Sequence, residues 1–191
     1  MLENLSKYKI ILASQSPRRR ELLAGLGVSF EVKVLPDVDE SYPVDLPVVE
    51  IAEYIARKKA DAYLLEPGEL LVTADTIVVA GQEVLGKPQT REDACRMLRL
   101  LSGCTHQVIT GVSLCTVSKR RHFSVTTDVT FKQLSESEIA YYVDTFQPYD
   151  KAGAYGIQEW IGYIGCTGLH GSYYNVMGLP VQRIYQELSV F

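Results

Sequence analysis

Long apolar runs and extended basic blocks are both missing from this sequence of 191 residues, and each absence argues against a class of protein. No stretch approaches the roughly 20 apolar residues of a membrane span, and the first residues, MLENLSKYK, contain no apolar signal core. No block of Lys and Arg is longer than residues 18–20, and the net charge is −4, which argues against a general nucleic-acid binder. We expect a soluble, cytoplasmic protein that binds neither membranes nor nucleic acid.

Cysteine and histidine are too few and too scattered to predict a zinc site. The four cysteines, at positions 95, 104, 115 and 166, include no C-x-x-C pair, and only three histidines could join them. Reduced thiols in the cytosol are the simplest interpretation of this spacing.

The composition is that of an ordinary globular protein, with 47 % hydrophobic and 22 % charged residues. A chain of this length can form one substantial domain or two small lobes that share a cleft, and we expect a single domain over 1–191. Strand and helix patterns alternate and several strand pairs look like hairpins, which predicts an α/β fold with a mixed, twisted sheet flanked by helices. The expected strands are 10–13, 30–35, 70–80, 83–85, 106–116 and 123–131; the expected helices are 17–26, 48–65, 90–101 and 135–146, followed by a glycine-rich hairpin at 160–173 and a turn and helix at 175–188. A capping box of Ser135 and Glu138 should open the helix 135–146. In the helix 90–101 the inward residues should be Ala94, Met97, Leu98 and Leu101.

The stretch IILASQSPRRRELL, residues 10–23, predicts an anion site. A buried strand ends at Ser14, Ser16 suits a helix N-cap, and Pro17 suits the first helical position. Residues 18–20 then place three arginines where the helix dipole disfavours cations by roughly 0.3 to 1 kcal/mol each. Backbone N–H groups, two serine hydroxyls and guanidinium groups would together bind a polyphosphate. The alternative is a solvated helix start whose arginines pair with acids elsewhere.

Asp75 is the best single catalytic candidate, because it interrupts the apolar run LLVTADTIVVA. A carboxylate among buried residues costs several kcal/mol unless it is paired, hydrogen-bonded or bound to a metal. The structural alternative is an aspartate satisfied by backbone N–H groups or by an arginine. Lys59 lies in the inward seam formed by residues 48, 52, 55 and 62 of the preceding helix, where it either snorkels outward or reaches into a site.

Other segments carry weaker candidates. The acidic loop 36–47 contains Asp39 and Glu40, and such loops are usually only solvated surface. Residues 81–88, GQEVLGKP, nearly match the phosphate-binding pattern G-x-x-x-x-G-K-[ST], but Pro88 has no hydroxyl and the stretch is typical of a hairpin, so only Lys87 is kept as a candidate. Residues 115–121 fit the C-x5-R spacing of cysteine phosphatases without the glycines or helix start needed to activate a thiolate. His106 is expected to be structural rather than a general base.

Six motifs, in order across nearly the whole chain, resemble those of the Maf family of nucleoside triphosphate pyrophosphatases, which shares a fold type with the inosine triphosphate pyrophosphatases. They are LASQSPRR (12–19), ADTIV (74–78), GKP (86–88), LSG-x-x-H-x-V-x-TGV (101–112), DKAGAYGIQ (150–158) and GSYYNVMGLP (171–180). Each motif alone is a weak signal, and the six together are highly specific.

The resemblance implies hydrolysis between the α- and β-phosphates of a nucleoside triphosphate, with a divalent metal such as Mg²⁺ or Mn²⁺, in house-cleaning of non-standard nucleotides. It also implies an elongated fold of two lobes around a central cleft, and usually a homodimer. The subgroup that acts on dTTP and UTP combines an Arg after S-x-S-P, a Lys in the turn and the Gln of YGIQ. The matching residues here are Arg18, Lys87 and Gln158, which favours dTTP and UTP over 7-methyl-GTP.

The hypothesis for the site divides its residues between two tasks. Asp75, with Glu40 or Asp39, would hold the metal and position or deprotonate the attacking water. The triphosphate would be bound, and charge on the leaving pyrophosphate offset, by Arg18, Arg19, Lys59 and Lys87. The remaining substrate-binding candidates are Ser14, Ser16, Asp150, Lys151 and Gln158.

Two alternative functions remain. The first is a non-hydrolytic nucleotide-binding regulator of cell division, in which the same groups sense a ligand. The second is a phosphatase that uses Asp75 as its nucleophile. Release of pyrophosphate, of orthophosphate or of neither distinguishes the three.

Overall fold

The computed structural model describes residues 2–191, which fall into two compact units. Unit 1 contains the described residues up to Asp75, together with Thr110–Val125 and Gly178–Phe191. Unit 2 contains Thr76–Ile109 and Thr126–Met177. The chain passes from one unit to the other after Asp75, Ile109, Val125 and Met177.

The strands form a mixed sheet in the hydrogen-bonded order β2-β1-β3-β5-β6-β7, with β4 paired to β3. In unit 1, β1 pairs in parallel with both β2 and β3; in unit 2, β4 is antiparallel to β3 and β7 is antiparallel to β6. The predicted mixed sheet flanked by helices is therefore confirmed. The strands are β1 (Lys9–Leu12), β2 (Phe30–Val32), β3 (Glu69–Ala80), β4 (Glu83–Leu85), β5 (Thr105–Cys115), β6 (Arg120–Phe131) and β7 (Cys166–His170).

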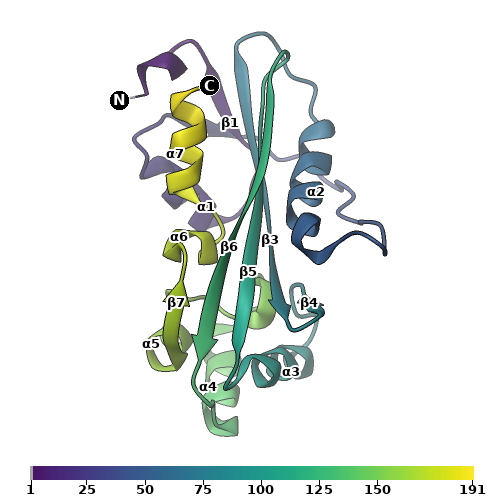
Figure 1. The fold of residues 1–191 in the computed structure, drawn as a ribbon, viewed down its shortest axis with the longest axis vertical. Coiled ribbons are helices and arrows are strands. Elements are labelled where there is room, and N and C mark those ends of the chain that lie inside the picture. Colours follow the sequence, from purple (N-terminus) through teal and green to yellow (C-terminus); the bar gives the residue numbers. More distant parts are fainter. Residues whose placement is uncertain (1) are drawn as a thin grey trace. The chain divides into compact units, whose positions relative to one another are not determined.

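The α-helices are labelled in Figure 1. Unit 1 has η1 (Glu3–Leu5), α1 (Pro17–Ala24), α2 (Val48–Asp61) and α7 (Val181–Ser189). Unit 2 has α3 (Arg91–Leu101), α4 (Glu136–Phe146), η2 (Ala152–Ala154), α5 (Trp160–Gly165) and α6 (Tyr173–Val176). Within residues 2–191 no helix is both long and apolar enough to cross a membrane.

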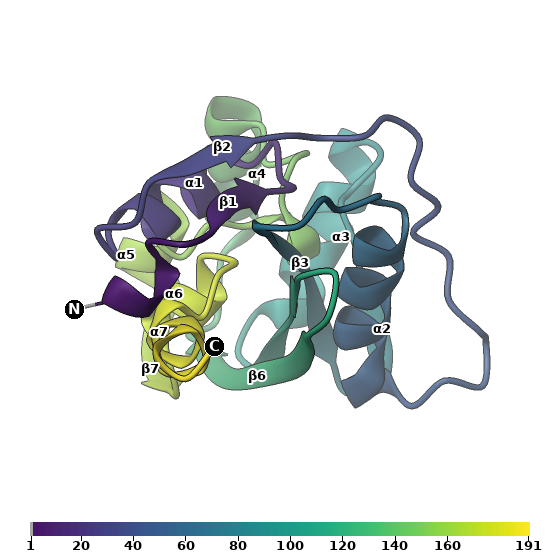
Figure 2. The same ribbon diagram turned by 90° about the horizontal axis from the view of Figure 1, so that it is seen from above.

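Helix α2 lies unusually close to the sheet of unit 1, and this closeness fixes the position of the side chains that it carries. Figure 2 shows α2 beside β3, and the Thr73 hydroxyl of β3 donates to the Ala56 carbonyl of α2 at 2.6 Å. A Cβ built on Gly111 of β5 would lie 2.2 Å from the backbone carbon of Ala52. Glycine is therefore required at position 111 for this approach.

Helices α3 and α4, which lie side by side in Figure 1, both contribute buried residues to the core of unit 2. The predicted inward face of α3 is confirmed, since Ala94, Met97, Leu98 and Leu101 are all buried. The predicted capping box of Ser135 and Glu138 is also confirmed at the start of α4.

Several expected element boundaries were wrong. Helix α1 ends at Ala24 rather than residue 26, and α2 ends at Asp61, so that Ala62 is exposed rather than inward. Strand β2 stops at Val32 because its partner β1 ends at Leu12, opposite it in the ladder.

The expected hairpin at 160–173 is instead helix α5 followed by strand β7. The glycines that suggested turns serve close packing here. A Cβ on Gly162 would lie 1.9 Å from the Ile157 carbonyl oxygen, so this helix can form at its position only with glycine there.

His106 is part of the core of unit 2. It is 2 % exposed, its Nε2 forms a 2.8 Å hydrogen bond with the Tyr155 hydroxyl, and its ring packs edge-on against Phe131. Burial lowers the pKa of His106 to about 4, so the imidazole is neutral at neutral pH. This environment agrees with the structural role expected from the sequence.

Replacing Gly111 with alanine should destabilise the protein by about 1–3 kcal/mol, because the new methyl group would overlap main-chain atoms of α2 that cannot rotate away. Urea denaturation followed by circular dichroism measures the change. Gly168→Ala is the matched control, since its Cβ would meet Thr130 at an ordinary 3.5 Å. Equal stability of Gly111→Ala and wild type would contradict the close approach.

The free energy of unfolding should contain a pH-dependent contribution from His106. Because the folded-state pKa lies below the unfolded value of about 6.5, the unfolded chain binds the extra proton first. The contribution of the neutral His106 to the free energy of unfolding is therefore fully present above about pH 6.5. It falls as the pH drops toward 4, and the loss is about 2 kcal/mol at pH 5. Urea denaturation at pH 7 and pH 5 should show a smaller loss in His106→Gln than in wild type. Identical losses in the two proteins would refute this assignment.

Candidate functional site

The turn between β1 and α1 is shaped by its two serines. The Ser16 amide donates to the Ser14 hydroxyl oxygen at 3.2 Å, and the Arg19 amide donates to the Ser16 hydroxyl oxygen at 3.4 Å. Ser16 is thus the N-cap and Pro17 the first helical residue, as predicted. Both serine oxygens are acceptors within the turn, whereas contact of these hydroxyls with phosphate stays a prediction.

Arg19 connects three segments of unit 1. Its Nε donates to the Gly178 carbonyl and its Nη1 donates to the Ala74 carbonyl, each at 2.8 Å. Burial lowers the pKa of Arg19, and the nearby Asp75 carboxylate opposes that shift. This guanidinium therefore holds the peptide just before Asp75 and the turn that leads into α7. Sequence reasoning missed Gly178, because a carbonyl partner leaves no signal in side-chain identity.

The Lys59 ammonium lies between two carboxylates. Its Nζ is 2.7 Å from Asp75 Oδ1 and 2.9 Å from Glu40 Oε1. The side chains of Lys59 and Asp75 are only 15 % and 14 % exposed, whereas that of Glu40 is 56 % exposed. Of the two outcomes expected for Lys59, the structure shows the inward one. The partner of Asp75 here is this lysine, and its side chain is not fully buried.

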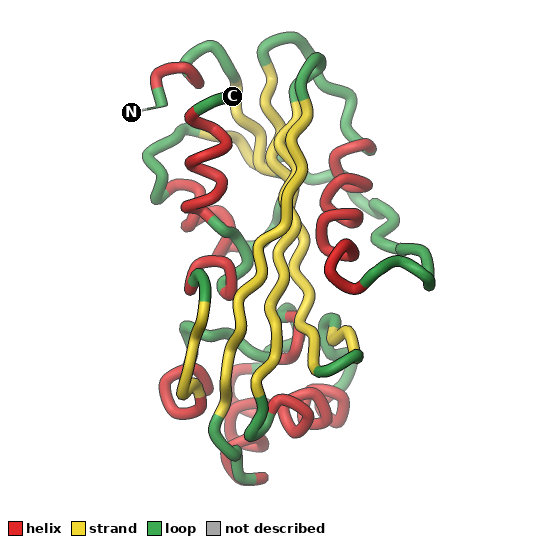
Figure 3. The backbone as a smooth tube through the Cα atoms, in the orientation of Figure 1, coloured by secondary structure: helices red, strands yellow, loops and turns green. Residues whose placement is uncertain are grey.

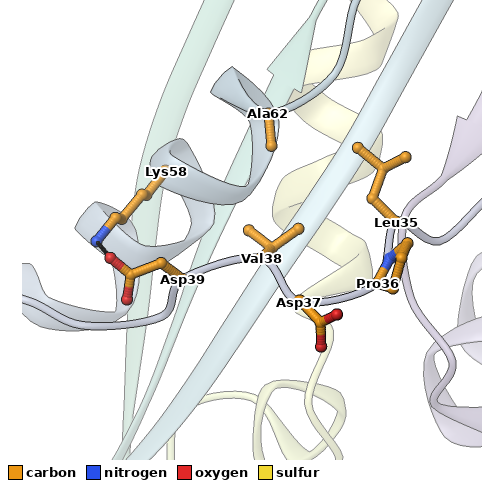
Figure 4. A pocket seen from close by; sticks show the side chains of 7 residues that line it. All are labelled: Leu35, Pro36, Asp37, Val38, Asp39, Lys58 and Ala62. Atoms are coloured by element: carbon orange, nitrogen blue, oxygen red, sulfur yellow. Dashed lines mark hydrogen bonds and ion pairs between the residues drawn. The ribbon is translucent and has the colours of Figure 1, made fainter.

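Asp39 has different surroundings from Glu40, although the two are neighbours in the long loop drawn green between β2 and α2 in Figure 3. Its carboxylate accepts from Lys58 Nζ at 2.6 Å and from the amide and hydroxyl of Ser41, each at 2.9 Å. The Lys58 hydrogen bond, with those from Ser41, lowers the pKa of Asp39 to about 2. Figure 4 shows the Asp39–Lys58 pair on the wall of a shallow pocket whose other side chains include Leu35 and Val38. Asp39 thus stabilises its own loop.

A divalent metal would find two carboxylates here rather than a complete site. Among residues 2–191 no group of three His, Cys, Asp or Glu side chains is arranged to hold a metal ion. Asp75 and Glu40 nevertheless both contact one cation, the Lys59 ammonium. Mg²⁺ is commonly bound through one or two carboxylates, with water and substrate phosphate completing its shell. The residues present fit that type of site.

In unit 2, the expected substrate loop begins with a buried lysine that pairs with two acids. The Lys151 side chain is 9 % exposed, and its Nζ lies 2.7 Å from Asp150 Oδ1 and 3.1 Å from Glu159 Oε1. These contacts direct the Lys151 ammonium to acids of its own loop. Contact of Asp150 or Lys151 with a substrate is a prediction that this geometry does not require.

The turn that carries Lys87 is joined to the same loop. The Gly153 amide donates to the Gly86 carbonyl at 3.0 Å. Gly153 has φ +70°, and a Cβ there would lie 2.9 Å from the Val78 side chain, so glycine allows the loop to approach β3. Lys87 is exposed on this turn, and the loop ends at Gln158.

Gln158 carries a buried polar atom without a partner. Within the part of the chain that the structure describes, no hydrogen bond reaches its Oε1. A buried acceptor left unsatisfied costs about 1–3 kcal/mol, so such an atom in a native protein needs an explanation. A ligand that donates an N–H to Oε1 would provide one.

Tyr142 and Glu159 were not predicted as part of any site. Tyr142 donates to Glu159 Oε2 and accepts from the Gly156 amide at 3.0 Å. Helical periodicity could place Tyr142 on the buried face of α4 but could not identify these polar partners.

Comparison with known proteins agrees with the six motifs. The family model described as "Maf-like protein" matches residues 9–191. Proteins named dTTP/UTP pyrophosphatase from Bacteroides thetaiotaomicron and Phocaeicola vulgatus are 63 % and 61 % identical, each over 99 % of this chain and 99 % of their own length. One from Flavobacterium johnsoniae is 49 % identical over 98 % of this chain and 97 % of its own. A solved structure of a HAM1 protein from Coxiella burnetii covers 96 % of this chain and 100 % of its own at 15 % identity and a TM-score of 0.46. Because the family model matches residues 9–191, this chain belongs to the Maf family.

Proposed function

We propose that this protein is a nucleoside triphosphate pyrophosphatase that hydrolyses dTTP and UTP to the monophosphate and pyrophosphate. The observation that carries the proposal is the contact of Asp75 and Glu40 with one ammonium, that of Lys59. The names of relatives at 63 % and 61 % identity support the choice of dTTP and UTP.

In this reaction a water molecule attacks the α-phosphorus, the bond to the bridging oxygen breaks, and pyrophosphate leaves. Asp75 is the group that orients the water and takes its proton. The Lys59 ammonium has three N–H donors, and two ion pairs direct it toward Asp75 and Glu40. The remaining N–H can donate to a phosphate oxygen, and the charge offsets the negative charge that grows on the leaving group.

Asp75 and Glu40 are the residues that would hold a divalent metal, Mg²⁺ or Mn²⁺. When bound, such an ion supplies positive charge to the phosphate oxygens and lowers the pKa of a bound water. Asp39 is not needed for this role, because its carboxylate is engaged by Lys58 and Ser41.

Gln158 is our candidate for reading the base. Thymine and uracil carry an N3–H donor, which the unpartnered Oε1 of Gln158 can accept. Cytosine has no hydrogen at N3 and would leave that oxygen unsatisfied. Arg18 and Lys87 remain candidates for binding the phosphates, on the match to the family's motifs.

Two wider properties also remain proposals. The four cysteines of the described chain are free thiols, which fits a reducing compartment such as the cytoplasm. The homodimer is implied by family membership alone.

The direct test is a panel of dTTP, UTP, CTP and 7-methyl-GTP with Mg²⁺ or Mn²⁺, read by pyrophosphate and orthophosphate detection. Pyrophosphate from dTTP and UTP supports the proposal. Orthophosphate alone would indicate a phosphatase, and tight binding without release of either product would indicate a regulator.

Asp75→Asn should reduce pyrophosphate release from UTP by about 10²–10⁴-fold, because the amide has nearly the same shape but cannot take the proton. Its thermal unfolding should remain close to that of the wild type, since Lys59 keeps Glu40 as a partner. A coupled pyrophosphate assay and circular dichroism measure the two quantities. Turnover near the wild-type rate would refute the role of Asp75.

Glu40→Gln and Asp39→Asn should separate the two neighbouring acids. Glu40 contacts the Lys59 ammonium at 2.9 Å, whereas Asp39 pairs with Lys58. We expect kcat for UTP to fall about tenfold or more in Glu40→Gln and to change by less than about threefold in Asp39→Asn. The same pyrophosphate assay, run over a series of Mg²⁺ concentrations, makes the comparison. A larger loss in Asp39→Asn would reverse the assignment.

A further inference from the structure

We infer that Tyr142, Glu159 and Lys151 form a clamp that positions Gln158, and that the base selectivity of the protein depends on this clamp. The inference rests on the proposed function, in which Gln158 reads the base. Tyr142 acts here as a positioning residue, because it acts through the loop and not on the nucleotide.

The clamp closes the loop from Lys151 to Glu159 at both ends. Lys151 Nζ lies 3.1 Å from Glu159 Oε1, which joins the residue that begins the loop to the residue that follows Gln158. The other oxygen of the same carboxylate, Oε2, accepts the hydroxyl of Tyr142. One carboxylate thus links the loop's first residue to helix α4.

The Tyr142 hydroxyl also holds the middle of the loop. It accepts the Gly156 amide at 3.0 Å while it donates to Glu159. Tyr142 is fully buried, and burial together with the Glu159 carboxylate raises the pKa of the phenol. The phenol therefore stays protonated and keeps both its donor and its acceptor role at neutral pH.

The packing around Gly156 leaves little room for the loop to rearrange. A Cβ on Gly156 would lie 2.9 Å from Glu159 Cδ and 3.0 Å from Gln158 Nε2. The Glu159 amide donates to the Gly156 carbonyl at 3.0 Å, which closes a tight turn around Gln158. The side-chain amide of Gln158 therefore packs against the same peptide that Tyr142 holds.

This arrangement explains how Gln158 Oε1 can remain buried without a partner. A free glutamine side chain would rotate to satisfy its acceptor, at little cost in strain. The close approach of Gln158 Nε2 to Gly156 restricts that rotation. The acceptor is then preorganised for a donor on the ligand, and the energy of the missing hydrogen bond is regained only when an N3–H arrives.

Tyr142→Phe tests the clamp, because it removes only the hydroxyl oxygen. The ring stays and still stacks on Phe146, with the two ring centroids 5.1 Å apart. We expect the ratio of kcat/KM for UTP to that for CTP to fall by about tenfold, since the Gly156 amide and Glu159 lose a shared partner. The matched control is Tyr141→Phe, a neighbouring side chain that is 50 % exposed, which should keep the wild-type ratio. A general loss of stability would lower both activities equally, and an unchanged ratio in Tyr142→Phe would overturn the inference.

A double-mutant comparison separates positioning from direct action. In a Gln158→Ala background, Tyr142→Phe should leave the UTP/CTP ratio unchanged, because there is no longer a side chain to position. Equal effects of Tyr142→Phe in both backgrounds would mean that the hydroxyl acts independently of Gln158, which would overturn the inference.

Hydrogen exchange makes the clamp testable even if the proposed function fails. If the wild-type protein released pyrophosphate from no nucleotide, the proposed function would be refuted, but the clamp would not. Exchange of the amides in 152–159 should still be faster in Tyr142→Phe than in wild type or Tyr141→Phe, because the Gly156 amide loses its acceptor. Unchanged exchange in this segment would show that the hydroxyl does not hold the loop.

Discussion

The pair of contacts made by the Lys59 ammonium is the interaction on which the candidate site of unit 1 depends. Asp75 comes from strand β3 and Glu40 from the long acidic loop, and two carboxylates that share one neighbourhood repel each other unless a cation lies between them. Lys59 is carried by α2, so the position of this cation depends on how α2 packs on the sheet. Gly111 and Thr73 fix the position of α2 against strands β5 and β3. Two residues outside the charged cluster therefore determine where the Lys59 ammonium lies.

Arg19 stabilises the same part of unit 1 through hydrogen bonds to neutral main-chain carbonyls. Three arginines at the positive end of a helix dipole predicted an anion site, and the alternative was a solvated helix start whose arginines pair with acids elsewhere. For Arg19 the structure offers another explanation, because two of its donors bind the Ala74 and Gly178 carbonyls. Its charge also lies in the field of Asp75, which opposes the effect of burial on its pKa. Phosphate binding remains a prediction, and for Arg18 the motif match is still its basis.

The parts of the fold that could be predicted from sequence are those whose signals are local. The capping box of Ser135 and the apolar periodicity of α3 determine their elements within a single turn or face, and both were correct. The 160–173 segment was misjudged because Gly162 is explained by a contact with Ile157 that only the folded chain reveals. The choice between Asp39 and Glu40 stayed open from the sequence for the same reason. Adjacent loop residues have identical local signals, and only the lysines of α2 distinguish them.

The two units use charge in different ways. In unit 1, Glu40 is more than half exposed beside Lys59, so its carboxylate is accessible to solvent and to a cation. In unit 2, the Lys151 ammonium pairs with the carboxylates of Asp150 and Glu159, and the neutral Oε1 of Gln158 is left without a hydrogen-bond partner. A charged side chain at position 158 would attract phosphate or water as readily as a base. Under the proposed function, a neutral acceptor held in place selects instead for a donor of matching position, and uracil and thymine carry such a donor at N3 whereas cytosine does not.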